Sequence, residues 1–339
     1  MTGPSAAQPV PQALGPGVAT PPRRPGSIRR TSTIDMSWPD GWGTRTRIRG
    51  RARDLLTPAD GSAPLVVADD VIDATASPDR TIEAISSNPE RVQLPELVGA
   101  RGGSRLRAAL ASVVPDERRR GTPLYLLLDD LAGATLIGGF AFTQWPDEWP
   151  EHWQHQRERA FKGRRMEGVC IGFRPGSTAL TAAGEPRPVD NTRPVAPLAD
   201  PADTVGWHRF SDSAGVAMRR ARRIDAWFDG DLHVDAMFQD SATVPSGGRV
   251  AVHEYQVYVR AAPDTFEVLS LEALPRVLPF GECPSAVTKI GQLVGLPLGD
   301  FRDAVLARLK TTEGCTHLND ELRALADAPL LAAHLEGEA

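Results

Sequence analysis

The stretch GRVAVHEYQVYVR, residues 248–260, alternates between two kinds of side chain. Val252, Glu254, Gln256 and Tyr258 fall on one face, and the other face carries Ala251, His253, Tyr255, Val257 and Val259. This period of two predicts a β-strand with one buried face. The preceding LHVDAMF, residues 232–238, alternates in the same way, and the Asp229-Gly230 pair before it favours a hairpin turn.

The chain after these two strands changes its period. TFEVLSLEAL, residues 265–274, continues as a further predicted strand. Apolar residues then recur at helical spacing in SAVTKIGQLVG, DFRDAVLARL and HLNDELRALADAPLLAAHL. This order predicts an antiparallel meander followed by helices.

An earlier part of the chain carries a similar pattern. RRTSTIDMSWPDG, residues 29–41, is followed 190 residues later by RRARRIDAWFDG, residues 219–230. LVGARGGSRLRAAL, residues 97–110, aligns without a gap with LVGLPLGDFRDAVL, residues 293–306. Several matching blocks in the same order indicate one module used twice. We therefore expect an α+β fold of two homologous modules related by a pseudo-twofold axis, each an antiparallel sheet packed by helices.

The expected organisation has four parts. Residues 1–27 are rich in Pro, Gly and Ala without apolar periodicity, which predicts a disordered tail. Residues 28–142 form a degenerate N-terminal module, residues 143–216 a linker with a Pro-rich stretch, and residues 217–335 the C-terminal module. Trp145, Trp149 and Trp153 in the linker are interpreted as packing over the modules.

The composition is that of an ordinary globular protein. The 339 residues are 41% hydrophobic and 24% charged, with a formal net charge of -5, which argues against a nucleic-acid partner. The sequence offers no 18-residue apolar run and no secretory signal, so we expect a cytoplasmic protein without a membrane partner. Three cysteines are too few for a disulfide framework and are expected to be thiols or metal ligands.

Every histidine and cysteine lies after residue 150. In the second module, His253 lies on the alternating strand, Cys283 at a Gly/Pro-marked turn, and Cys315 and His317 at the start of the last helical stretch. Thiolate and imidazole are the preferred ligands of Zn(II). These four residues are therefore the candidate metal ligands, although their spacing matches no zinc-finger pattern.

A second reading makes Cys315 a nucleophile. A helix N-terminus stabilises a thiolate, and His317 or His253 could accept its proton. Cys315 and His317 converge only if Cys315 lies outside the helix, with Asp320 or Glu321 orienting the imidazole. The alternatives without chemistry are a packing role for the buried thiols or a closed structural zinc site.

Two other clusters have simpler interpretations. The arginines of MRRARRID, residues 218–225, could hold an anion, but a solvated strand edge with Asp partners is the favoured interpretation. Asp129 and Asp130 follow an apolar run and are interpreted as a helix end rather than a metal site.

The segments VAVHEYQVYVR, LPRVLPFGECPSA and GCTHLNDELRALA resemble a bacterial family known as domain of unknown function 2889. The shared pattern is an Arg-rich start, a His-Asp or His-Glu strand, a Cys-Pro turn and a Gly-Cys-Thr-His-Leu ending. The resemblance covers residues 219–331, and residues 29–142 follow it only in outline. It implies the following signature residues: Asp225, Asp240, His253, Glu254, Cys283, Pro284, Cys315, Thr316 and His317. Glu254 stands where the family pattern also allows Asp.

Together these observations predict an enzyme of small-molecule metabolism, a metal-dependent lyase or hydrolase or a cysteine enzyme. The catalytic residues would be Cys315, His317 and His253, and the metal ligands His253, Cys283, Cys315 and His317, with zinc as the expected cofactor. The substrate is expected to be a small organic molecule, aromatic or carboxylate-bearing, and a homodimer is the expected assembly. The alternative is a non-catalytic ligand-binding or interaction protein with a structural Cys/His metal site.

Overall fold

The computed structural model describes residues 11–17, 19–148, 166–189, 191–211, 213 and 215–336. Within these residues, one antiparallel sheet has the strand order β4-β3-β2-β1-β6-β7-β8, with β5 and β9 both pairing with β8. The strands are β1 (Ser27–Ser37), β2 (Thr46–Thr57), β3 (Leu65–Ala76), β4 (Ile82–Asn88), β5 (Arg193–Val195), β6 (Ala217–Asp229), β7 (Asp231–Thr243), β8 (Arg249–Ala261) and β9 (Val268–Val277). The fold is thus a mixed α/β fold with one large antiparallel sheet, and the predicted strands 232–238 and 248–260 lie within β7 and β8.

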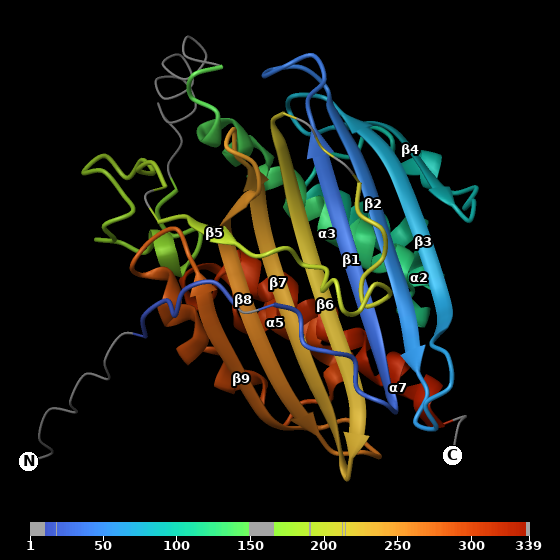
Figure 1. The fold of residues 1–339 in the computed structure, drawn as a ribbon. Helices are drawn as coiled ribbons and strands as arrows, with labels where there is room; N and C mark the ends of the chain where they lie inside the picture. The colour runs from blue at the N-terminus through green and yellow to red at the C-terminus, as the bar shows by residue number, and fades with distance from the viewer. Residues whose placement is uncertain are drawn as a thin grey trace, which may run out of the picture.

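The helices cover one face of this sheet (Figure 1). The α-helices are α1 (Ser104–Val113), α2 (Pro115–Arg120), α3 (Pro123–Ile137), α5 (Phe301–Arg308), α6 (Thr316–Ala324) and α7 (Ala328–Glu336). The 3-10 helices are η1 (Leu94–Leu97), η2 (Gly138–Gln144), η3 (Ile171–Phe173), η4 (Cys283–Thr288), η5 (Ile290–Leu293), η6 (Leu298–Asp300), η7 (Thr311–Glu313) and η8 (Leu325–Asp327). The stretch 285–295, predicted to be helical, forms only the short turns of η4 and η5, and Gly295 ends it in a left-handed conformation.

The two halves of the sheet join at β1 and β6, side by side in its centre (Figure 1). The arginine-rich stretch 219–223 therefore lies in a central strand, and the prediction of a solvated strand edge is wrong. Arg220 and Arg222 are at most 1% exposed and face the helices, whereas Arg219 and Arg223 face the opposite side. The predicted Asp partners are present, because Arg220 binds Asp240 and Arg222 binds Asp130.

Helix α3 is buried from Pro123 to Ala134, and only its last turn reaches the surface. Asp129 and Asp130 lie in its interior rather than at its end, and both are at most 5% exposed, so the helix-end interpretation is wrong. Their charges are balanced by arginines of β6, α5 and α6, which the local sequence does not reveal. The stretch Pro123–Gln144 is long and apolar enough to cross a membrane, but 83% of its most apolar window is buried inside the protein. It packs on β1, β2 and β3 as a core helix does.

The opposite face of the sheet is crossed by two irregular segments (Figure 1). One includes residues 11–17 of the predicted disordered tail, where the Leu14 amide donates to the Pro275 carbonyl over 2.9 Å. The other belongs to the predicted linker and meets the first segment where Thr20 donates to the carbonyl of Leu198. In the same linker, Trp145 is buried and donates to the carbonyl of Thr243. Trp149 and Trp153 lie outside the described residues.

Candidate functional site

A cavity of about 770 Å³ opens between the helix-covered face of the sheet and the segment 166–189. Its wall contains all four residues that the sequence singled out: His253, Cys283, Cys315 and His317. Both halves of the chain contribute, since η2 and α3 supply further wall residues. Residues far apart in the sequence thus meet at one cavity, whose volume is within the range usual for small-molecule sites.

His253 lies on the same buried face of β8 as Tyr255 and Val257, as the alternation predicts, and a bulge directly precedes it in the strand. The β7–β8 register pairs Asp240 with His253 and Ser241 with Ala251, so Val252 is an extra residue in the ladder. This bulge interrupts the alternation at Val252, and Val252 and His253 both line the cavity. Bulges occur often beside active sites, where they redirect side chains.

The imidazoles of His253 and His317 are stacked, with ring centroids 3.3 Å apart and 17° between the ring planes. His253 Nδ1 and His317 Nε2 each lie 3.7 Å from Asp240 Oδ2. In the described part of the chain, this is the group of three His, Cys, Asp or Glu side chains whose ligand atoms all lie within 4.8 Å of one another. Asp240 is fully buried and does not line the cavity, whereas both histidines do.

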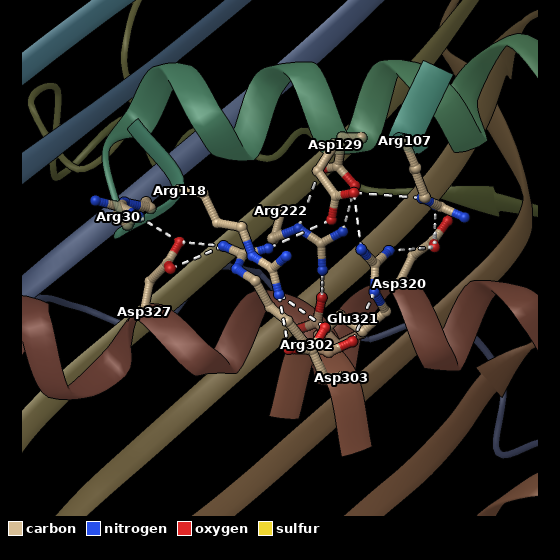
Figure 2. A network of polar contacts seen from close by, with 12 residues as sticks. Arg30, Arg107, Arg118, Asp129, Arg222, Arg302, Asp303, Asp320, Glu321 and Asp327 are labelled. Carbon is tan, nitrogen blue, oxygen red and sulfur yellow. Dashed lines mark hydrogen bonds and ion pairs between the residues drawn. The ribbon is translucent and has the colours of Figure 1, made fainter. Parts of the chain in front are cut away.

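Asp240 belongs to a chain of ion pairs. Arg220 donates to both of its carboxylate oxygens over 2.9 Å, and Arg220 Nη1 donates to Asp320 on α6 over 2.9 Å. Asp320 also accepts from Arg107 of α1. Figure 2 shows Arg107 and Asp320 within the network that joins α3, above, to the C-terminal helices below. The carboxylate beside the histidines is therefore held in one orientation.

Burial keeps both imidazoles neutral. It lowers the pKa of His317 to about 3, with the nearby Arg220 guanidinium acting in the same direction. It also lowers the pKa of His253 well below the usual range, and His317 adds to this effect. Neutral imidazole is the form that binds a metal ion.

Cys315 is the N-cap of α6, so it lies outside the helix as convergence with His317 demands. Its sulfur is 3.9 Å from His317 Nδ1, and the Thr316 hydroxyl is 3.4 Å from the same nitrogen. Of the two acidic residues expected to orient this imidazole, Asp320 pairs with arginines and Glu321 pairs with Arg222. The contacts at Nδ1 leave Nε2 of His317 directed towards Asp240.

The other two cysteines meet at Gly172. A Cβ atom on this glycine would lie 2.7 Å from Cys283 Sγ and 3.7 Å from Cys170 Sγ. Only glycine therefore lets the backbone at residue 172 lie this close to the Cys283 sulfur. Burial raises the pKa of Cys170 to about 11 and also raises the pKa of the Cys283 and Cys315 thiols. All three are therefore protonated at neutral pH.

The structure divides the predicted four-residue set. His253 and His317 come together with Asp240, whereas Cys315 contacts the far side of the His317 ring and Cys283 lies with Cys170. Asp240 was not among the predicted ligands, although its place two residues after Phe238 puts it on the buried face of the same alternating strand. Glu254 lies on the opposite face, where Gln239 and the Gly17 amide donate to it.

Comparison with known proteins gives one match. No curated protein and no solved structure matches the chain. Residues 218–330, the C-terminal region that contains Asp240, His253 and His317, match the family model described as protein of unknown function (DUF2889).

Proposed function

We propose that this protein is a metal-dependent enzyme that acts on a small organic molecule, with a divalent cation held by His253, His317 and Asp240. The observation that carries the proposal is His253 Nδ1, a buried nitrogen with no hydrogen-bond partner that lies 3.7 Å from the Asp240 carboxylate. A buried polar atom without a partner is costly, and a bound cation would satisfy it.

The nitrogen-to-oxygen distances at the site are close to those that a single ion requires. Nitrogen and oxygen ligands bind Zn(II) at about 2.0 to 2.2 Å, which places tetrahedral ligand atoms about 3.4 Å apart. The two nitrogen-to-oxygen separations are 3.7 Å. Because a metal lies in the plane of each imidazole that binds it, the ion would have to turn the two rings out of their stacked arrangement.

The neighbouring residues support the three ligands. Arg220 fixes the Asp240 carboxylate, and the groups at Nδ1 of His317 leave its other nitrogen free for the ion. Hydrogen-bonded partners of this kind orient the ligands of metal sites. The proposed set omits Cys283 and Cys315, because neither sulfur belongs to the group of convergent ligand atoms.

Three protein ligands leave a coordination position open, and the histidines border the cavity. This arrangement is typical of catalytic metal sites, in which the ion polarises a substrate or activates water, whereas structural zinc sites are closed by four protein ligands. A hydrolase or a lyase is therefore the reaction class that we propose. The cysteine mechanism has less support, because all three thiols have raised pKa values.

The test is elemental analysis of purified, tag-free protein beside three variants. One equivalent of a divalent metal is expected in the wild type and in His334→Gln, which changes an exposed histidine of α7. His253→Gln and His317→Gln should lose the metal while keeping the circular dichroism spectrum of the wild type. If the wild type takes up no zinc, manganese or iron on titration, or if both variants keep the ion, the proposal is wrong.

A non-catalytic ligand-binding protein is the second candidate, because the same cavity would serve it. Spectroscopy with Co(II) in place of the native ion separates the two. A catalytic site should show Co(II) with an exchangeable water ligand in its open position, whereas a structural site closed by four protein ligands should not.

We also propose that the two halves of the chain arose by duplication. The central strands pair Ser32 with Arg222, which are equivalent residues at the 190-residue offset of the repeated motifs. The turns at the equivalent glycines Gly99 and Gly295 make the same kind of backbone contact. The Gly99 amide donates to the carbonyl of Ile82 at the start of β4, and the Gly295 amide donates to the carbonyl of Val268 at the start of β9. Both glycines have positive φ, 88° and 82°. An experimental structure in which the two halves do not superpose over these strands and turns would refute the duplication.

A further inference from the structure

Aromatic rings form much of the cavity wall. Trp42 packs edge-on against Phe142 with ring centroids 4.5 Å apart. Both residues line the cavity and lie in the N-terminal half of the chain, before the wall segment 166–189. A second pair, Phe173 and Phe280, comes from η3 and from the loop after β9, with centroids 5.6 Å apart. Trp42, Phe173 and Phe280 are only half-buried. Their uncovered ring surface is therefore available to a bound molecule.

The remaining wall includes aliphatic side chains, among them Leu136, Ile137 and Val252. A volume of about 770 Å³ is within the usual range for small-molecule sites. Aromatic faces bind flat rings by stacked or edge-to-face contacts, which a saturated ring of equal size cannot make equally well. The wall thus favours a planar aromatic molecule.

The polar end of the cavity has few free charges. Arg107 and Arg220 line it, but both donate to carboxylates of the protein. Arg187, a third arginine of the wall, is exposed and donates through Nε to the carbonyl of Leu180. An acidic group on the ligand would therefore find its strongest partner at the cation proposed for His253 and His317.

We infer that the cavity binds a planar aromatic molecule of one or two rings that carries an anionic oxygen, carboxylate or phenolate, directed at the metal. This inference rests on the proposed function for the oxygen and on the aromatic wall for the ring. The two parts can be measured separately.

The experiment uses calorimetric titration with 2-naphthoate and with its saturated analogue, decahydro-2-naphthoate, on the zinc-loaded full-length protein. We expect 2-naphthoate to bind at least fivefold more tightly than the analogue. Phe280→Leu keeps an apolar side chain but removes a ring, and should weaken 2-naphthoate binding about fivefold with little change for the analogue. The control Phe228→Leu changes a partly buried ring outside the cavity and should leave both affinities unchanged.

The oxygen is tested by removing the metal and by Arg187→Gln. Metal-free protein should bind 2-naphthoate at least tenfold more weakly, and Arg187→Gln should bind it as the wild type does. A tenfold loss in Arg187→Gln, with no loss on metal removal, would overturn the assignment of the oxygen to the metal. Equal affinities for the two naphthoates in wild type and in Phe280→Leu would overturn the aromatic assignment. If no zinc binds at all, the proposed function fails. The comparison of the two ligands on metal-free protein then still shows whether the cavity prefers an aromatic ring to a saturated one.

Discussion

Arg220 holds Asp240 through two parallel hydrogen bonds, each 2.9 Å long, from Nε and Nη2 to the two carboxylate oxygens. Both side chains are at most 1% exposed, so water does not compensate either charge. The third guanidinium nitrogen reaches Asp320. One arginine of β6 thus fixes a carboxylate of β7 and another of α6, and so connects the sheet to the helix that carries His317.

Removing this arginine should be severely destabilising. Arg220→Met keeps most of the side-chain volume but leaves Asp240 and Asp320 as buried carboxylates with fewer partners. We expect a loss of about 3 to 5 kcal/mol in the free energy of unfolding, measured by urea denaturation. Arg49→Met is the control, because Arg49 and Asp73 form an exposed pair whose loss should cost less than about 1 kcal/mol. Equal losses in the two variants would contradict this account of the network.

The ion pair between Arg220 and Asp320 leaves no space for a side chain at Gly133 of α3. In most helix interiors, Gly→Ala stabilises by about 1 kcal/mol. A Cβ atom on Gly133 would overlap with Arg220 Nη1 and Asp320 Oδ2, so Gly133→Ala should lower the free energy of unfolding by about 2 kcal/mol despite its better helix propensity. Gly291→Ala in η5 meets no atom within 4 Å and should be close to neutral in the same unfolding assay. A stabilised Gly133→Ala would mean that the ion pair can shift at little cost.

The alternation of residues 232–238 and 248–260 was enough to predict β7 and β8. It could not predict the burial of Arg220 and Arg222, because an arginine is buried only when partners distant in sequence meet it, here Asp130 of α3 and Asp240 of β7. The same limit applies to the site. The sequence identified His253 and His317, but the choice of Asp240 over the cysteines as their neighbour depends on the register between β7 and β8 and on the packing of α6 against β7.

The thiols are predicted to react slowly in the folded protein. Because burial raises the pKa of Cys170 to about 11, its thiolate fraction at pH 8 is about one hundredth of that of an ordinary cysteine. Cys283 and Cys315 are more deeply buried, and their pKa values are also raised. Iodoacetamide at pH 8 should therefore label none of the three within minutes, as followed by peptide mass spectrometry, and should label all three in urea. Rapid labelling of Cys315 alone would instead support its role as a nucleophile.

A pH dependence of stability is expected from His208, which lies outside the cavity wall. Its two ring nitrogens lie 2.9 Å from the hydroxyls of Thr31 and Thr33, and burial lowers its pKa to about 3, with Arg51, Arg53 and Arg219 acting in the same direction. The folded state therefore keeps the imidazole neutral, whereas the unfolded chain takes up a proton near pH 6.5.

Since the unfolded state binds more protons between pH 6.5 and pH 3, the contribution of His208 is fully present above pH 6.5 and is lost as the pH falls. The loss should be about 2 kcal/mol between pH 6.5 and pH 5, measured by urea unfolding at each pH. His208→Gln can still hydrogen-bond to a threonine but does not titrate. Between pH 6.5 and pH 5, the free energy of unfolding of this variant should therefore fall by about 2 kcal/mol less than that of the wild type. His334→Gln, which changes an exposed histidine, should keep the wild-type slope. Parallel slopes in His208→Gln and the wild type would show that the buried imidazole is protonated in the folded state after all.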